Sequence, residues 1–176
     1  MELHPTTLSG VTIITVNAHV DDRGLFARTF DIEEFARAGL PTSWPQCNTS
    51  STDRRWTLRG MHFQAAPRPD PKLVRCTRGR IFDVAVDLRP DSATFRRWTG
   101  VELSADNRNA LFIPAGCAHG FLTLEDNCEV LYMMGDVYLP ELARGVRWND
   151  PAFGIAWPSD PVAISERDAS WPDFPS

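Results

Sequence analysis

The chain has 176 residues, of which 43% are hydrophobic, and a formal net charge of −5 at pH 7. This length and composition are sufficient for one domain with a buried core. The negative charge argues against a general nucleic-acid or membrane-surface binder, and no apolar run is long enough to span a bilayer. The N-terminal residues lack the basic and apolar regions of a secretory signal, so we expect a cytoplasmic protein.

The first third of the chain contains one predicted strand and the clearest predicted helix. Residues 11–16, VTIITV, are β-branched and apolar, which predicts a strand. After a turn, residues 25–30 alternate in the manner of a second strand. The helix expected over 31–39 has Asp31 to cap its first N–H groups and Gly39 to end it.

From residue 46 onward we expect strands and no further helix of comparable quality. The predicted strands are TLRGMHF, KLVRC, RIFDVAVDL, WTGVEL, ALFIP, HGFLTL and CEVLYMM. A spacing of about ten residues between short strands is typical of an antiparallel sandwich or barrel. The proline-rich segment after Trp157 is expected to wrap the surface. We therefore predict a mostly β fold with one or a few short helices.

The cysteines and histidines give little support to a metal site. The chain has four widely spaced cysteines, Cys47, Cys76, Cys117 and Cys128, without a CxxC motif or a Cys/His cluster. We interpret them as reduced thiols. Only His62 and His119 lie in predicted strands, whereas a divalent transition metal needs three or four converging donors. We expect no metal.

A short motif narrows the β class. Residues 114–119 read Pro-x-Gly-x-x-His directly after a predicted strand. This pattern resembles the second half-motif of the cupin barrel, a double-stranded β-helix or jelly roll. Metal-binding cupins carry two histidines one residue apart in the first half-motif, and here the matching stretch, residues 60–64, has only His62. The resemblance predicts a cupin-like jelly roll. A metal cupin remains an alternative, although the sequence offers few metal ligands.

Five residues could carry proton chemistry, although each also has a simpler structural explanation. Lys72 is the only lysine among 18 lysine and arginine residues, and a lysine ammonium is a compact charge suited to a reaction centre. It could equally be a solvated loop charge. His62 could be a core histidine, and His119 could satisfy backbone groups at its turn. Tyr132 could be a buried tyrosine with one hydrogen bond, and Asp168 a surface carboxylate.

Many ordered blocks of the sequence resemble the dTDP-4-dehydrorhamnose 3,5-epimerases, which are cupin-fold enzymes. The blocks are DDRGLFARTF, QCNTSST, TLRGMHFQ, PKLVRCTRGRIFDVAVDLRPDSATF, WTGVELSADN, LFIPAGCAHGF, LYMMGDVY, RGVRWNDPAFGIAWP and ISERD. They extend from about Val11 to Asp168. So long a series is a far more specific match than one short motif. The resemblance implies that residues 1–176 form a single cupin-like epimerase domain with an N-terminal strand extension and a C-terminal wrapping tail.

The resemblance also implies a reaction and its catalytic residues. The family's substrate is a 4-keto-6-deoxyhexose joined to a nucleoside diphosphate, and its C4 ketone acidifies the hydrogens on C3 and C5. Inversion at these carbons needs acid/base groups on both faces of the ring. By resemblance His62 is the base, Asp168 orients it, Tyr132 is the proton donor, and Lys72 stabilises the enolate oxygen. No cofactor is implied, in agreement with the lack of a G-x-G-x-x-G motif.

Substrate binding is implied at a second set of positions. These are Arg23, Arg28, Gln46, Asn48, Arg59, His119 and Tyr138. In the family several such contacts come from a neighbouring subunit, so a homodimer with a shared site is implied, with no role for nucleic acid or membrane.

The chain departs from the family at three positions. Arg28 and Ala143 stand where family members often have acidic residues, and Met133 stands where a polar or basic one is common. These departures leave open the nucleobase, with CDP- or GDP-linked sugars as alternatives, and whether one carbon or two are inverted. A non-catalytic cupin that binds nucleotide sugars, and a metal cupin such as a dioxygenase, are further alternatives.

Overall fold

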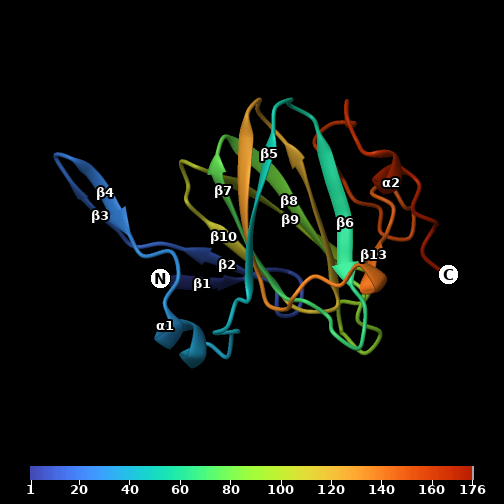
Figure 1. Ribbon diagram of the computed structural model, residues 1–176, viewed down its shortest axis with the longest axis horizontal. Helices are drawn as coiled ribbons and strands as arrows, with labels where there is room; N and C mark the ends of the chain where they lie inside the picture. Colours follow the sequence, from blue (N-terminus) through green and yellow to red (C-terminus); the bar gives the residue numbers. More distant parts are fainter. Residues whose placement is uncertain (176) are drawn as a thin grey trace.

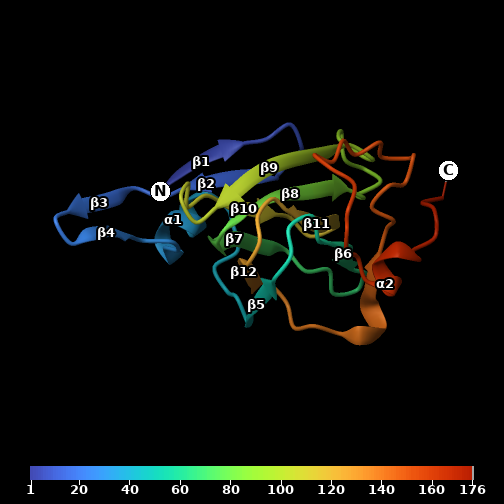
Figure 2. The same cartoon turned by 90° about the horizontal axis from the view of Figure 1, so that it is seen from above.

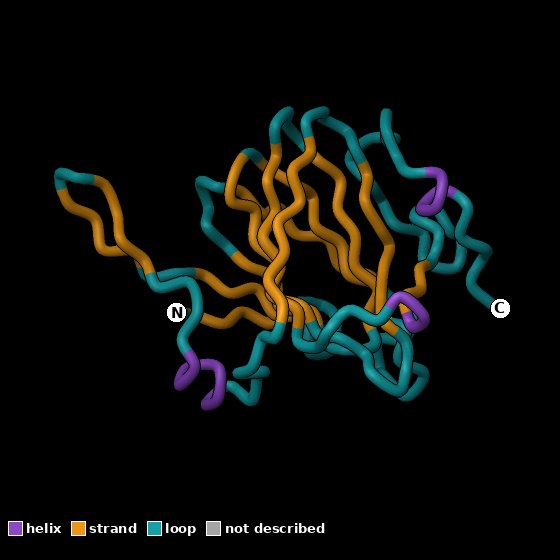
Figure 3. The backbone as a smooth tube through the Cα atoms, in the orientation of Figure 1, coloured by secondary structure: helices purple, strands orange, loops and turns teal. Residues whose placement is uncertain are grey.

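The computed structural model describes residues 1–175, and these are mostly β-strand (Figure 3). The strands are β1 Glu2–Pro5, β2 Thr12–Thr15, β3 Ala18–Asp21, β4 Gly24–Ala27, β5 Gln46–Thr52, β6 Leu58–Gln64, β7 Lys72–Arg78, β8 Arg80–Asp87, β9 Trp98–Ser104, β10 Ala110–Ile113, β11 Cys117–Thr123, β12 Cys128–Met134 and β13 Ala143–Gly145. The helices are α1 Ile32–Arg37, α2 Glu166–Ala169 and the 3₁₀ turn η1 Pro140–Leu142.

Two antiparallel sheets form the body of the molecule. One has the strand order β1-β2-β10-β7-β12-β5, and the other has the order β13-β6-β11-β8-β9. The hairpin β3–β4 forms a third, two-stranded sheet, which projects away from this body in both cartoon views (Figures 1 and 2). The C-terminus lies at the opposite end of the molecule from this hairpin (Figure 1). The prediction of a mostly β fold is confirmed.

Side chains alternate between the two faces of each strand, so every second one points towards the other sheet. These inward-facing side chains form the main core between the two sheets. On β7, Val74 and Cys76 belong to this core, whereas Leu73 packs into a cluster on the outer face. The core residues are Leu8, Val11, Val74, Cys76, Ile81, Ala85, Leu103, Leu111, Ile113, Cys117, Phe121, Cys128 and Val130. Such alternation fixes which side chains can enter a space between the sheets.

The outer face of the six-stranded sheet is covered by the segment that contains α1. Asp31 caps this helix by accepting hydrogen bonds from two backbone N–H groups, of Glu33 and Glu34, as predicted. Phe35, the buried residue of the helix, packs edge-to-face against Phe30 and Trp44. The helix therefore serves to bury the apolar outer face of the sheet.

The outer face of the five-stranded sheet is covered by residues of the C-terminal part of the chain. Phe153, Trp157 and Phe174 join a cluster with Met61 and Val84 of the sheet. This part of the chain is also joined to β6 by backbone hydrogen bonds, among them Leu58 N–H to the Ala163 carbonyl at 2.9 Å. These contacts bring α2 against β6.

Close packing of β6 on β11 requires glycine. Gly60 has φ +133°, and a Cβ built there would lie 2.4 Å from the Cα of Gly120. A larger residue at either position would push the two strands apart. The close approach sets the spacing of the strands that carry His62 and His119.

Four strands, β1, β3, β5 and β13, were missed by the sequence analysis. β1 pairs with β2, and β5, with the polar sequence QCNTSST, pairs with β12. A polar edge strand carries no hydrophobic pattern, so its backbone pairing alone makes it a strand. The other predicted strands and the predicted helix are confirmed.

All four cysteines are free thiols, as expected. Burial raises the pKa of the Cys76 and Cys117 thiols to about 12, which makes both poor nucleophiles. Within residues 1–175, none of the helices has the length and apolar character needed to cross a membrane.

Candidate active site

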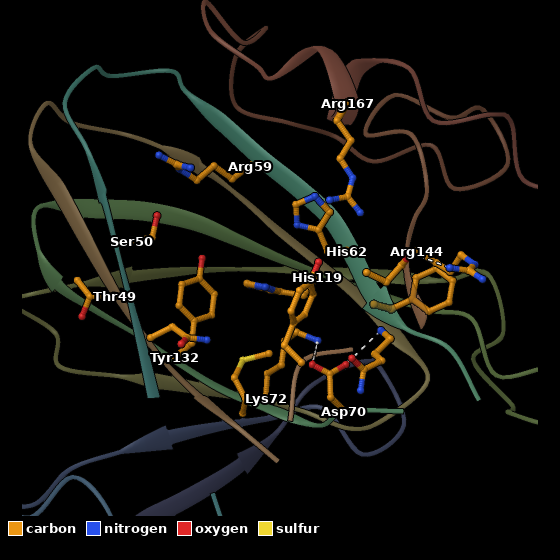
Figure 4. A pocket seen from close by; sticks show the side chains of 16 residues that line it. Thr49, Ser50, Arg59, His62, Asp70, Lys72, His119, Tyr132, Arg144 and Arg167 are labelled. Atoms are coloured by element: carbon orange, nitrogen blue, oxygen red, sulfur yellow. Dashed lines mark hydrogen bonds and ion pairs between the residues drawn. The ribbon is translucent and has the colours of Figure 1, made fainter. Parts of the chain in front are cut away.

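A cavity of about 290 Å³ opens between the two sheets at one end of the sandwich. Its polar side chains continue the inward-facing rows of the core: Lys72 lies two residues before Val74, and Tyr132 two residues after Val130. His62 and His119 enter from the opposite sheet, where they are cross-strand partners. The predicted catalytic residues from both sheets therefore meet at one place (Figure 4).

His62 and Asp168 form the first pair of this site. The imidazole Nε2 lies 2.7 Å from Asp168 Oδ1, and Asp168 Oδ2 accepts the Gly60 N–H at 3.2 Å. Burial would raise the pKa of Asp168, but the hydrogen bond and charge of His62, with those from Gly60 and Ser165, lower it below its ordinary value. An ionised carboxylate at Nε2 leaves Nδ1 free to act as a base.

Asp168 is buried, so its interpretation as a surface carboxylate is wrong. It lies in the short helix α2, where its own N–H is held at 3.1 Å by the Ser165 hydroxyl. The imidazole of His62 remains 44% exposed and lines the cavity. The pair therefore has a buried acid and an accessible base.

Tyr132 reaches the same cavity from β12, in the other sheet. Burial raises the pKa of its phenol above the ordinary value, and the negative charge of Asp83 raises it further, against the opposing charge of Arg59. The phenol is therefore protonated at neutral pH and can donate a proton. Figure 4 shows its ring and that of His62 approaching the cavity from different strands.

Lys72 is buried, with only 6% of its surface exposed, so its interpretation as a solvated loop charge is wrong. Its ammonium lies 2.8 Å from Asp70 Oδ2, and both side chains line the cavity. The strand β7 begins at Lys72, so the side chain lies where the core between the two sheets meets the cavity.

His119 and Asp83 form a second imidazole–carboxylate pair, also at 2.7 Å, between Nε2 and Oδ1. Asp83 is fully buried, and its Oδ2 has no hydrogen-bond partner among the described residues. Burial raises the pKa of Asp83, while the charge of His119 and its hydrogen bond act in the opposite direction. The His119 ring packs edge-on against Tyr132, with centroids 5.8 Å apart.

Three guanidinium groups line the cavity, those of Arg59, Arg144 and Arg167. Arg59 is held against β5 by hydrogen bonds to the Thr52 hydroxyl at 3.0 Å and the Ser51 carbonyl at 3.2 Å. Figure 4 shows Arg167 directed towards His62 and Arg144 directed away from it. The rim can therefore attract an anion although the chain is net negative.

The predicted binding residues divide into two groups. Asn48, Arg59, His119 and Tyr138 line the cavity of their own chain. The other three, Arg23, Arg28 and Gln46, are not part of the cavity lining formed by residues 1–175.

Each residue of the second group has a partner elsewhere in the chain. Arg23 is at the tip of the β3–β4 hairpin and pairs with Asp21, and Arg28 pairs with Asp31 at 2.7 Å. The side-chain amide oxygen of Gln46 accepts the Tyr138 N–H at 2.6 Å. The two arginines therefore do not line the cavity of their own chain.

The described residues contain no group of three histidine, cysteine, aspartate or glutamate side chains with a geometry that could hold a metal ion. The donors of the site are instead two imidazoles, each already bound to one carboxylate. This arrangement suits proton transfer.

The family model for dTDP-4-dehydrorhamnose 3,5-epimerase matches residues 5–176. The chain is 48% identical over 169 residues to the dTDP-4-dehydrorhamnose 3,5-epimerase of Methanothermobacter thermautotrophicus, covering 94% of this chain and 90% of that protein. The chain belongs to this epimerase family.

Solved structures of similar proteins agree with this assignment and with the predicted cupin-like fold. The dTDP-4-dehydrorhamnose 3,5-epimerase of Elizabethkingia anophelis superimposes with a TM-score of 0.94 at 36% identity, covering 99% of this chain and 96% of that one. The structure of ChmJ, a 3′-monoepimerase from Streptomyces bikiniensis in complex with dTDP-quinovose, superimposes with a TM-score of 0.89 at 34% identity. The match covers 97% of this chain and 86% of that one. The family's fold thus accommodates proteins described as inverting one or two centres.

Several residues of this epimerase site were not found from sequence. Asp70, Asp83 and Arg167 are each in contact with the site or part of its lining. Asp83 had one available signal, because a carboxylate within the apolar run IFDVAVDL needs a buried partner. Asp70 lies in a loop and Arg167 in the short helix α2, and the placement of both depends on the fold. Of the departures from the family pattern, Ala143 lines the cavity.

Proposed function

We propose that this chain converts dTDP-4-dehydro-6-deoxy-D-glucose to dTDP-4-dehydro-L-rhamnose by inverting C3 and C5, without a cofactor. Family membership supports the reaction, and one observation supports its chemistry. The His62–Asp168 pair and the Tyr132 phenol reach one cavity from opposite sheets. A sugar ring between the sheets would present one face to a base and the other to an acid.

His62 removes the proton in this scheme. Its Nε2 is bound to Asp168, so Nδ1 takes the hydrogen from C3 or C5 and the carbanion electrons move to O4. Asp168 fixes the ring orientation and stabilises the imidazolium that forms.

Lys72 and His119 lie beside the same cavity and stabilise the enolate on O4. A preorganised cation at such a position contributes about 3–4 kcal/mol.

Tyr132 returns a proton to the opposite face of the ring. Its raised pKa keeps the phenol protonated until the carbanion is present to accept the proton. The site then returns to its starting state when His62 loses a proton to water and the tyrosinate gains one. Each inversion therefore introduces one hydrogen from the solvent.

The nucleotide is bound by the rim of the cavity in this proposal. Arg59 contacts the diphosphate, Asn48 the nucleoside, and Tyr138 stacks on the base, while Gln46 fixes the Tyr138 backbone. Arg23 and Arg28 serve a neighbouring subunit, which makes the enzyme a homodimer with shared sites. The exposed Val20, Leu25 and Phe26 of the β3–β4 hairpin support an interface there.

Two wider proposals concern the whole chain. Residues 1–176 act as one domain, supported by the shared core of the two sheets and by the tail that covers one of them. The location is cytoplasmic, which the free thiols support.

A mono-epimerase is the second candidate, because the structure of ChmJ resembles this chain nearly as closely as that of the Elizabethkingia enzyme. Incubation with dTDP-4-keto-6-deoxyglucose in heavy water separates the two. We expect deuterium at both C3 and C5 by proton NMR, and uptake at one carbon alone would replace the double epimerase by a mono-epimerase. CDP- and GDP-linked sugars, tested in parallel, should react more slowly. Activity should survive chelation.

The donor role is tested by Tyr132→Phe, which removes only the phenolic hydroxyl. We expect the turnover number to fall by about 10²- to 10³-fold, with proton loss from the substrate less affected than inversion. Thermal unfolding of the variant controls for stability. Normal turnover would contradict the donor role and would favour a cupin that only binds nucleotide sugars.

A further inference from the structure

Asp70 is a buried carboxylate that lines the cavity and that the proton-transfer scheme does not use. It lies in the loop between β6 and β7 and is 7% exposed. Its Oδ2 contacts the Lys72 ammonium at 2.8 Å, and its Oδ1 accepts the Gln64 N–H at 3.1 Å. Both carboxylate oxygens therefore have a defined partner (Figure 4).

The loop that carries Asp70 is itself fixed by Gln64. The side-chain amide of Gln64 donates to the Arg68 carbonyl at 2.7 Å and to the Val137 carbonyl at 3.2 Å, and its oxygen accepts the Leu139 N–H at 2.8 Å. Gln64 thus joins the loop that carries Asp70 to the end of β6 and to the segment after β12, through hydrogen bonds of both its backbone and its side chain. The position of the carboxylate is determined by the scaffold and not by Lys72.

A lysine side chain has a flexible four-carbon stem, and its ammonium is costly to remove from water. An adjacent carboxylate lowers that cost and limits the directions that the ammonium can take. Within residues 1–175, Asp70 provides the one carboxylate in ion-pair contact with Lys72. Asp70 thus has both the position and the charge needed to fix Lys72.

We propose that Asp70 is a positioning residue, which holds the Lys72 ammonium oriented where the enolate oxygen forms. This inference rests on the proposed function, because that function places O4 of the sugar beside Lys72. Since the Asp70–Lys72 pair is neutral as a unit, it contributes little long-range attraction for a diphosphate. The role of Asp70 should therefore appear in the chemical step and not in substrate binding.

Kinetics of Asp70→Asn test this separation, because asparagine keeps an oxygen for the Gln64 N–H and loses only the charge. We expect kcat to fall about tenfold or more while KM changes by less than about twofold. The exposed Asp91→Asn is the matched control and should leave both constants unchanged. A raised KM with an unchanged kcat would overturn the proposal.

A double-mutant cycle shows whether Asp70 acts through Lys72. If it does, Asp70→Asn should cause no further loss of kcat in a Lys72→Met background. An equal loss in both backgrounds would mean that Asp70 acts by another route. Asp70→Glu, which keeps the charge and moves it by one methylene, should recover part of kcat. A Glu variant as slow as the Asn variant would contradict the charge argument.

The single lysine allows a test that does not depend on activity. In protein labelled with ¹⁵N-lysine, a sharp ammonium signal requires protons that are held in an ion pair and protected from water, and one lysine gives one signal. We expect this signal in the wild type and in Asp91→Asn, and its loss in Asp70→Asn. Its persistence in Asp70→Asn would refute the positioning role even if epimerisation occurs. Failure of epimerisation with the expected signals would instead refute the proposed function.

Discussion

The site contains two imidazole–carboxylate pairs with the same 2.7 Å separation and different surroundings. In the His62–Asp168 pair both carboxylate oxygens have partners, the acid has a lowered pKa, and the imidazole is 44% exposed. In the His119–Asp83 pair one carboxylate oxygen has no partner among residues 1–175, the acid has a raised pKa, and the imidazole is 4% exposed. The two pairs therefore have the same imidazole–carboxylate distance, but the pKa of the acid is shifted in opposite directions.

The difference indicates how one fold can use the same two residue types for two tasks. An accessible imidazole beside an ionised carboxylate can take up a proton and release it to water, as a base must. A buried imidazole beside a carboxylate with a raised pKa is held in one place and is better suited to donate a hydrogen bond. Both imidazoles have the same hydrogen bond to a carboxylate, so it is the difference in burial that suits His62 to act as a base and His119 to act as a fixed hydrogen-bond donor.

We expect the largest difference between the two pairs when each imidazole is replaced by alanine. His62→Ala should abolish deuterium exchange at both carbons, with a loss of about 10⁴-fold, because the base is gone. His119→Ala should lower kcat by only about tenfold, the value of one hydrogen bond of about 1.4 kcal/mol. Solvent exchange measured by NMR checks both variants. Comparable losses would mean that the two pairs do not have separate tasks.

A smaller effect is expected at the carboxylates. Asp168→Asn should lower kcat by about a hundredfold, because the amide can hold His62 in the wrong tautomer and cannot stabilise the imidazolium. Asp83→Asn should cost less than about tenfold, since an amide can still bond to His119. Steady-state kinetics, with binding of dTDP as the folding control, measure the contrast. An Asp83→Asn defect as large as that of Asp168→Asn would remove the distinction.

The smallest effect is on stability and depends on pH. The lowered pKa of Asp168 contributes stability that is present above its ordinary value of 3.8 and is lost as pH falls through the folded-state value. The raised pKa of Asp83 contributes stability that is present below 3.8 and is lost as pH rises through the folded-state value.

Thermal unfolding between about pH 2 and about pH 7 tests these two signs, because the Asp168 window lies below 3.8 and the Asp83 window lies above it. As pH rises, Asp168→Asn should lose Tm relative to the wild type, whereas Asp83→Asn should gain Tm relative to it. Parallel curves for the two variants would show that the two carboxylates share one environment.

The strands with an apolar pattern, the α1 helix and the family could all be predicted from the amino-acid sequence. A cap at Asp31 and alternation along segments such as KLVRC and CEVLYMM act locally, so they can be recognised without a fold. The same alternation places Lys72 and Tyr132 on the faces that carry Val74 and Val130. Resemblance to the family supplied their proposed roles.

Which charged side chains lie in contact depends on how distant segments of the chain pack together. His62 and Asp168 are 106 residues apart, and the carboxylate arrives because the C-terminal tail is hydrogen-bonded to β6. Burial in the core raises the pKa of Asp83. Arg23 lies between β3 and β4, in a hairpin that projects away from the body of the molecule. Local patterns fix the face on which a side chain lies, whereas distance and burial depend on how sheets and tail pack.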